Sequence, residues 1–315
     1  MKMNQSTLRK MYYAAKPVMP RSLQLALRRQ WIAKRTPMFE QVWPIDPSTV
    51  KSRPYNWRGW PQGKQFAFVL THDVELQGGH DKCLQLLRLE EELGFRSSFN
   101  FVPERYNVSP LLRKQIAESG FEVGVHGLNH DGKLYASQQV FEKRAAKING
   151  YLRDWDAVGF RSPAMHHNLE WLRKLNVLYD ASTFDVDPFE PQSDGVGAIF
   201  PFKVGGDSGY IEMPYTLPQD FTLFILLGEK NASIWKKKLD WLAENGGMAL
   251  VNVHPDYLNF GDSPMKREEF PVEIYHEFLT YVKTEYAGAY WHALPRETAT
   301  FWKERRTANK RQLAA

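Results

Sequence analysis

The chain has 315 residues, of which 43% are hydrophobic and 14% are aromatic, and its formal net charge is +5. This length and composition suit a folded protein with a large core and exclude a disordered one. The single cysteine, Cys83, excludes an internal disulfide, and the apolar run at residues 223–227 is far too short to cross a bilayer.

The positive charge is concentrated at the N-terminus. Residues 1–60 contain 12 lysines and arginines against two acidic residues, a net charge of +10, which leaves −5 for the rest. Within them, residues 20–35 (PRSLQLALRRQWIAKR) place Leu23, Leu27 and Trp31 four residues apart among basic side chains, which predicts a basic amphipathic helix. This helix either packs on its own domain or binds an anionic membrane surface. Because no nucleic-acid-binding motif accompanies the charge, we expect no nucleic-acid partner.

The composition also predicts a location and a domain arrangement. The first residues, MKMNQSTLRKMYYAAKP, lack the apolar stretch of a secretory signal peptide, so we expect a cytoplasmic protein, peripheral at the inner membrane face if the basic region binds lipid. We predict three parts: a basic N-terminal extension and connector at residues 1–63, a barrel at residues 64–302, and a basic C-terminal tail at residues 303–315.

Short apolar runs alternate with helical patterns from residue 64 onward. The predicted strands are FAFVL, RSSFNFV, FEVGV, AVGF, VLYDAS, GYIEMPY, MALVNV and AYWHAL, and an amphipathic segment follows most of them. Repeated strand–helix alternation predicts an α/β fold with a parallel sheet, and seven or eight such units favour a closed (β/α) barrel over an open sheet.

The ends of these strands carry matched polar side chains. They read THDVE, VPE, HGLNHD, RSPAMHH, YDASTFD, MPYTLPQD and NVHPDY, and four of the seven contribute histidine. Because the carboxyl ends of parallel strands meet at one edge of a barrel, we expect these groups to face one another. Glu104 and Asp220 also lie at strand ends, where a solvated role is as plausible as a role in the site.

Two histidines and a carboxylate predict a metal site. His126 and His130 are four residues apart, which on a helical turn places both imidazoles on one face. Strand geometry points Asp73 and Glu75 to the same face as each other. Two histidines with one carboxylate form a common ligand set for a catalytic divalent metal, and the second carboxylate can accept a proton. Which of the two carboxylates binds the metal stays open.

Five motifs of the chain resemble, in order and spacing, those of the polysaccharide deacetylases, the NodB-homology or carbohydrate esterase 4 family. The resemblance covers roughly residues 64–295, and the motifs are THDVE, HGLNH, RSPA, YDAS and LVNVHP. The resemblance implies a distorted (β/α) barrel that removes N-acyl groups from sugars with a divalent metal ion, usually Zn²⁺. It makes Asp73 the catalytic base and His126 and His130 metal ligands. Val74 stands where the common motif has a metal-binding Asp, and Glu75 resembles the Asp-x-Asp spacing of some members, with a longer arm.

The resemblance also implies roles for the later motifs. Arg161 would orient the base, Asp180 would line the substrate groove, and Leu250 would form part of the pocket for the acyl methyl group. His254 would protonate the departing amine. Ala164 replaces the family's usual Tyr, but the role of that residue, stabilising the oxyanion with its backbone N–H, remains possible.

These observations predict a metal-dependent hydrolase that removes an N-acetyl or other N-acyl group from an amino sugar, in the synthesis of a surface polysaccharide or a lipid-linked glycan. One alternative is an amidohydrolase acting on a small cyclic amide or ureide. Another is a catalytically inactive glycan-binding protein with the same fold, for which Val74 is the best support.

Overall fold

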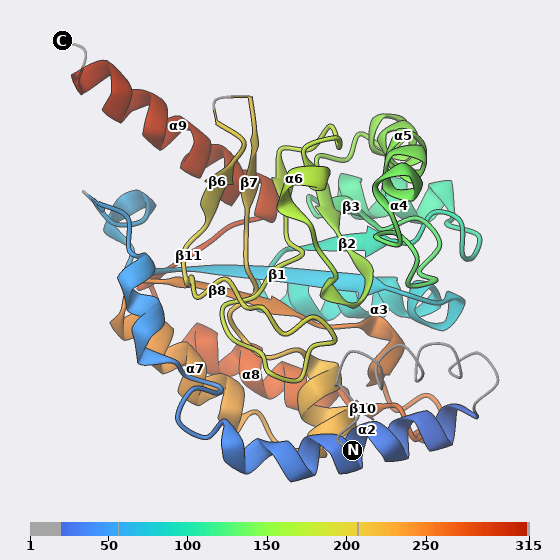
Figure 1. Cartoon of the computed structure of the whole chain (residues 1–315). Coiled ribbons are helices and arrows are strands. Elements are labelled where there is room, and N and C mark those ends of the chain that lie inside the picture. The colour runs from blue at the N-terminus through green and yellow to red at the C-terminus, as the bar shows by residue number, and fades with distance from the viewer. Residues whose placement is uncertain (1–19, 56, 207, 314–315) are drawn as a thin grey trace, which may run out of the picture.

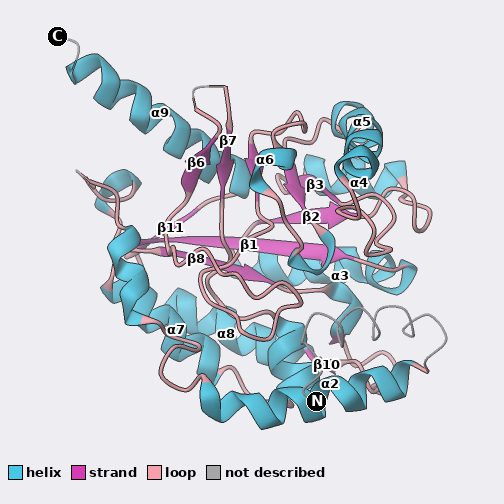
Figure 2. Cartoon of the chain, in the orientation of Figure 1, coloured by secondary structure: helices cyan, strands magenta, loops and turns pink. Residues whose placement is uncertain are grey.

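We describe the protein from a computed structural model, which defines residues 20–55, 57–206 and 208–313. A curled sheet runs through the middle of the molecule and helices surround it (Figure 1, Figure 2). Residues 1–19 of the predicted N-terminal extension lie outside the described residues.

Nine strands of the described residues form the main sheet, in the order β11-β1-β2-β3-β4-β5-β7-β6, with β8 also paired to β1. Only the β6–β7 pair is antiparallel in this part of the chain. Their bounds are β1 Phe66–Val74, β2 Ser97–Phe101, β3 Glu122–His126, β4 Gly159–Arg161, β5 Tyr179–Asp180, β6 Phe202–Val204, β7 Tyr210–Glu212, β8 Met248–Asn252 and β11 Tyr290–His292. A small separate sheet pairs β9 Leu258–Asn259 with β10 Phe270–Pro271.

Strand β1 is the centre of the sheet. β8 pairs along one edge, while β11 and β2 share the other edge, β11 beside the amino half of β1 and β2 beside its carboxyl half. All nine side chains of β1 are buried, as expected for a parallel strand covered on both faces.

The sheet curls because the chain beyond β7 returns to β8. The backbone N–H groups of Thr216 and Leu217 donate to the carbonyl oxygen of Leu250, at 3.1 and 3.2 Å. The result is a distorted (β/α) barrel, which confirms the predicted fold class.

Helices follow most strands, and local sequence signals set their ends. Pro110 occupies the first turn of α4, where Ser109 Oγ accepts from the Leu112 N–H, and left-handed Gly94 ends α3. The α-helices are α2 Arg21–Arg35, α3 Gln77–Leu93, α4 Pro110–Glu118, α5 Gln138–Asp154, α6 Leu169–Leu172, α7 Ser233–Glu244, α8 Val272–Glu285 and α9 Pro295–Leu313. Shorter turns are the 3₁₀ segments η2 Thr36–Met38, η3 Pro47–Ser52, η4 Pro61–Gly63, η5 Pro163–Met165 and η7 Pro255–Tyr257, and the π-helix η6 Phe221–Leu227.

The predicted amphipathic helix is present as α2, but its buried face differs from the predicted stripe. Leu25 and Ile32 are buried, whereas Leu23, Leu27 and Trp31 are exposed. Further along the N-terminal segment, other side chains join the barrel core: Trp60 is buried and stacks on Phe200 at a ring-centroid distance of 6.3 Å. At the other end, α9 continues without a break through residues 302 and 303. None of the described helices is both long and apolar enough to cross a bilayer.

Candidate metal centre

The carboxyl ends of β1 and β3, on either side of β2, bring the predicted ligands together. His126 is the last residue of β3, and Glu75 directly follows β1. His130 lies in the loop after β3. One ligand atom from each of Glu75, His126 and His130 can be chosen so that all three lie within 4.8 Å of one another. These three residues are the candidate metal centre.

The path between the histidines is not the predicted helical turn. After His126 the chain leaves the sheet through Gly127, at φ +62°, and reaches His130 in the left-handed region, at φ +53°. A Cβ on Gly127 would lie 2.5 Å from Cγ of Pro163, so only glycine fits this turn without displacing η5. The turn brings the two rings to a centroid distance of 5.2 Å.

The ring nitrogens are arranged to accept a cation. Nδ1 of His126 lies 3.1 Å from the Arg161 carbonyl oxygen, which can only accept, so Nδ1 carries the proton and Nε2 keeps a free lone pair. Nε2 of His126 is buried and makes no hydrogen bond within the described part of the chain, and the buried Nε2 of His130 lies 3.0 Å from Oε1 of Glu75. Buried polar atoms are almost always paired. An unpaired, buried Nε2 beside a second imidazole and its carboxylate therefore fits a divalent metal.

Glu75 is the carboxylate best placed to complete the set. Its Oε1 lies 3.0 Å from Nε2 of His130, and its Oε2 accepts a hydrogen bond from the Tyr257 hydroxyl at 3.1 Å. Burial raises its pKa, but the nearby charges of His130, His254 and His126 outweigh that effect and hold the pKa well below its usual range. The close contact of Asp73 with His126 is to Nδ1, at 3.8 Å, and this nitrogen already donates to the Arg161 carbonyl oxygen. The geometry therefore favours Glu75 over Asp73 as the third ligand.

Asp73 is instead held as a buried carboxylate. Asn100 donates to its Oδ1 at 3.0 Å, and Asn252 donates to its Oδ2 at 2.9 Å. Burial raises the pKa of Asp73, but the charges of His126, Arg161 and His254 outweigh burial and lower this pKa to about 2. The carboxylate is therefore ionised at neutral pH.

The buried side chain of Arg161 contacts both Asp73 and Asn252. The side chain is 1% exposed, and its Nη1 lies 3.3 Å from Oδ1 of Asp73. Nη1 also donates to Oδ1 of Asn252 at 2.7 Å, and Nε donates to the Ala181 carbonyl oxygen at 2.7 Å. Arg161 thus contacts Asp73 directly and is also linked to it through Asn252.

His254 faces Asp73 from the end of β8. Its Nε2 lies 4.0 Å from Oδ2 of Asp73 and 3.9 Å from Oε1 of Glu75. Its Nδ1 lies 2.7 Å from Oδ1 of Asp220, and its backbone N–H donates to Oδ2 of the same carboxylate at 2.7 Å. Burial lowers the pKa of His254, but Asp220, Glu75 and Asp73 outweigh burial and raise it to about 10. Sequence reasoning left the role of Asp220 open, and no local motif distinguishes it.

The remaining predicted residues lie at different depths. Ala164 is exposed in η5 at φ +53°, a conformation that favours glycine, and its backbone N–H makes no hydrogen bond to the described backbone. Asp180 and Leu250 are both fully buried in this structure. Both oxygens of Asp180 accept hydrogen bonds from Ser182, which keeps the carboxylate inside the core.

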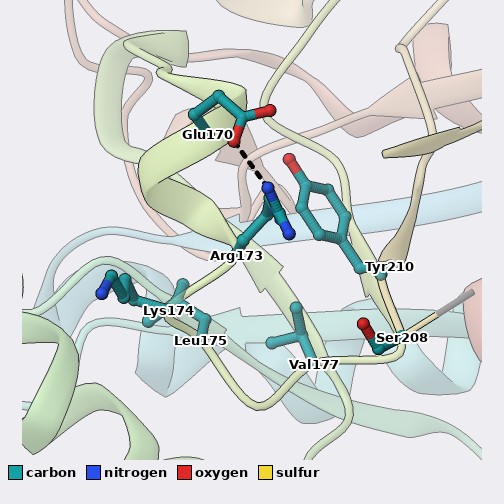
Figure 3. Close-up of a pocket in the computed structure, with 8 residues that line it drawn as sticks. Glu170, Arg173, Lys174, Leu175, Val177, Ser208 and Tyr210 are labelled. Atoms are coloured by element: carbon teal, nitrogen blue, oxygen red, sulfur yellow. Dashed lines mark hydrogen bonds and ion pairs between the residues drawn. The ribbon is translucent and has the colours of Figure 1, made fainter. Parts of the chain in front are cut away.

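A cavity of about 390 Å³ lies elsewhere, between α6 and the β6–β7 connection (Figure 3). Its lining includes Arg173, Lys174 and Tyr210, but no histidine. Arg173 donates to Glu170 at 2.8 Å, so its charge already has a partner. The residues suited to catalysis therefore lie at the metal centre and not in this cavity.

No family model matches the chain, and no curated protein matches it in sequence. Solved structures do share its fold. One described as a polysaccharide deacetylase from Mycobacterium smegmatis aligns at 19% identity and a TM-score of 0.61, over 80% of this chain and 95% of that chain. Puue allantoinase aligns at 15% identity and a TM-score of 0.61, over 82% and 97%. A structure described as a polysaccharide deacetylase from Pseudomonas aeruginosa PAO1 aligns at 15% identity and a TM-score of 0.60, over 82% and 95%.

These likenesses define the class of fold. The chain has the distorted barrel of the polysaccharide deacetylases, the NodB-homology type that the motifs predicted. The allantoinase shares the same architecture.

Proposed function

We propose that the protein is a metal-dependent hydrolase that removes an N-acetyl or other N-acyl group from an amino sugar. The observation that carries the proposal is the grouping of Glu75, His126 and His130, with Asp73 and His254 next to it and 4.0 Å from each other. Two histidines and a carboxylate would hold a divalent metal with positions left open for substrate and water, and we propose zinc. When bound, such a metal polarises the acyl carbonyl and lowers the pKa of water.

Asp73 would act as the general base. Its low pKa keeps it ionised at neutral pH, so it can accept a proton from the attacking water. Asn100, Asn252 and Arg161 fix both carboxylate oxygens, which orients Asp73 toward the site. The backbone N–H of Ala164, which makes no hydrogen bond to the described backbone, would donate to the developing oxyanion.

His254 would act as the general acid. Its pKa of about 10 keeps the imidazole protonated at neutral pH, and its Nε2 faces the site while Nδ1 is held by Asp220. A protonated His254 can give its Nε2 proton to the departing amine, which would otherwise be a poor leaving group. In this proposal Leu250 supports the site from the core rather than by direct exposure.

For the substrate, we propose an N-acylated sugar of a surface polysaccharide or of a lipid-linked glycan on the cytoplasmic side of a membrane. Structures sharing the fold are described as polysaccharide deacetylases. A second candidate is a small cyclic amide or ureide, because an allantoinase aligns as well as those structures do.

Hydrolysis assays on purified protein test the proposal. The metal content is measured first, and N-acetylated oligosaccharides are then compared with cyclic ureides as substrates. We expect the wild type to release acetate. In Asp73→Asn the rate of release should fall at least about 10²-fold, while the amount of bound metal stays the same. Hydrolysis of the ureides alone would replace the sugar substrate, and a protein that binds no divalent metal and hydrolyses neither class would contradict the proposal.

A further inference from the structure

Helix α2 turns an apolar stripe outward. Leu23, Leu27 and Trp31 are 47%, 41% and 42% exposed and lie at i, i+4 and i+8, so they share one side of the helix. Met38 and Val42, just beyond the helix, are also exposed. Five of the nine large exposed hydrophobic side chains in the described residues therefore fall within 20 residues of sequence. Scattered exposed apolar residues are ordinary, but such a concentration marks an interaction surface.

The opposite side of α2 is already occupied. Leu25 and Ile32 are buried in the main core, and Nε of Arg29 donates to the Ile225 carbonyl oxygen of η6 at 2.7 Å. The guanidinium of Arg28 lies over the Phe221 ring, 5.2 Å from its centroid. Since these contacts hold α2 against the barrel, the exposed stripe has a fixed orientation.

The charge around the stripe identifies its partner. The segment from residue 20 to residue 42 contains five lysines and arginines and one acidic residue, Glu40. Lys34 is exposed on the outer side of α2, and Arg35 lies over the Trp31 ring at 4.5 Å. A two-fold contact between copies of this chain would set these cations against themselves. An anionic lipid surface instead accepts the apolar side chains between its headgroups and attracts each cation.

We propose that the outer face of α2, defined by Leu23, Leu27, Trp31 and Lys34, docks the protein on an anionic lipid bilayer. The helix would lie in the plane of the interface, with the three apolar side chains inserted at headgroup depth. α2 lies along the lower rim of the molecule in Figure 1, with one side free of the barrel.

The inner side of α2, opposite this docking face, lies close to the metal centre. Arg28 contacts Phe221, whose ring lies 5.0 Å from that of Tyr257, and Tyr257 donates to Glu75. Two side chains therefore separate α2 from the candidate metal ligand. If the proposed deacylation is correct, on which this step rests, a docked molecule holds its site beside the bilayer, and the substrate class is an amino sugar carried on a lipid anchor.

Vesicle flotation with the full-length protein tests the docking face. The vesicles are pure phosphatidylcholine, or phosphatidylcholine mixed with phosphatidylglycerol. We expect the protein to float with the anionic vesicles only. Binding should fall at least about tenfold in the double variant Leu27→Glu, Trp31→Glu, and about fivefold in Lys34→Ala at low salt.

Leu111→Glu is the matched control, because Leu111 is 64% exposed on α4, away from α2. This variant should float as the wild type does. Thermal unfolding and metal content, measured on every variant, separate loss of binding from loss of the fold. Equal flotation of wild type and the double variant, or no flotation of the wild type, would overturn the proposal. Lipid-free self-association that the double variant abolishes would assign the face to a second copy instead. Because flotation requires no catalysis, failure of the proposed hydrolysis would not affect this result.

Discussion

Asp220 makes two contacts with His254 and is the main group that sustains the positive charge of that imidazole. A general acid works only while it is protonated, so activity should fall as pH rises through the pKa of His254. Replacing Asp220 with Asn removes the largest stabilising charge. The pKa of His254 should then fall, and the alkaline limb of the kcat/KM profile should move to lower pH by ~1–2 units. The measurement is the pH dependence of hydrolysis in wild type and Asp220→Asn.

Glu104→Gln is the control for that experiment. Glu104 is another carboxylate at a strand end, but it is paired with Lys147 at 2.9 Å near the surface. Its replacement should leave the profile unchanged. An alkaline limb that stays in place in Asp220→Asn would show that Asp220 does not set the protonation of the acid.

Glu104 and Asp220 also show where sequence reasoning on single residues ends. Both follow predicted strands, and nothing in the local sequence separates them. Only the tertiary fold brings Asp220 to His254, 34 positions away, and leaves Glu104 with a lysine. The same limit applies to Asn100 and Asn252, which hold Asp73 but belong to no pattern that signals a site. In contrast, the grouping of Glu75, His126 and His130 was predictable because metal chemistry restricts the usable residue types.

At the scale of elements, the turn after β3 brings His130 beside His126. Gly127 and Gly132 both have left-handed φ, at +62° and +73°, but only a Cβ at Gly127 meets other atoms, those of Pro163. Gly132→Ala should cost about 1 kcal/mol of unfolding free energy, from backbone strain alone. Gly127→Ala carries that strain and a clash with η5, so we expect a cost of about 2–4 kcal/mol.

Metal titration distinguishes the two glycine variants further. The clash at Gly127 moves the chain between His126 and His130, so Gly127→Ala should bind the metal more weakly while Gly132→Ala binds it as the wild type does. Equal unfolding free energies and equal metal affinities in the two variants would contradict this account of the turn.

The order of helices and strands was predictable from the sequence, but which side of each element is buried was harder to predict. Strand–helix alternation gave the barrel because each apolar run must be buried in one sheet. The spacing of His126 and His130 suggested a helical turn, yet the chain is still leaving β3 at that point, and Gly127 determines its path. In α2, both sides of the helix carry apolar residues. Contact with η6 selected Leu25 and Ile32, a choice that periodicity alone cannot make.

At the scale of the whole molecule, one buried lysine of the barrel also contacts the N-terminal segment. Lys238 of α7 is fully buried, and its Nζ lies 2.6 Å from both Oδ2 of Asp185 and the Pro44 carbonyl oxygen. Lys238→Met removes the cation and leaves Asp185 buried without its partner, which should cost about 3–5 kcal/mol of unfolding free energy. Lys237→Met, at the exposed neighbouring position, should change stability by less than about 0.5 kcal/mol.

The cost at Lys238 should depend on pH. Burial raises the pKa of Asp185 to about 6 even though the charge of Lys238 opposes that rise. Without Lys238 the folded-state pKa should rise further, so the unfolded state gains more from ionisation as pH increases. Denaturant unfolding should therefore show a larger loss of stability at about pH 8 than at about pH 5. A loss that is the same at both values would contradict the role of Asp185.

Metal binding should stabilise the whole chain, because its ligands join the ends of β1 and β3. A metal present at about 100 times its dissociation constant adds about 2.7 kcal/mol to the unfolding free energy, and in a chain of this size that raises Tm by about 5 °C. Removing the metal with a chelator should lower Tm by this amount, and restoring zinc should recover it. His130→Ala lacks one ligand, so its Tm should equal that of the metal-free protein with or without chelator. His276 is an exposed histidine on α8, and His276→Ala should respond to the chelator as the wild type does. Calorimetric scans that coincide with and without metal in the wild type would show that Glu75, His126 and His130 do not hold a structural or catalytic cation.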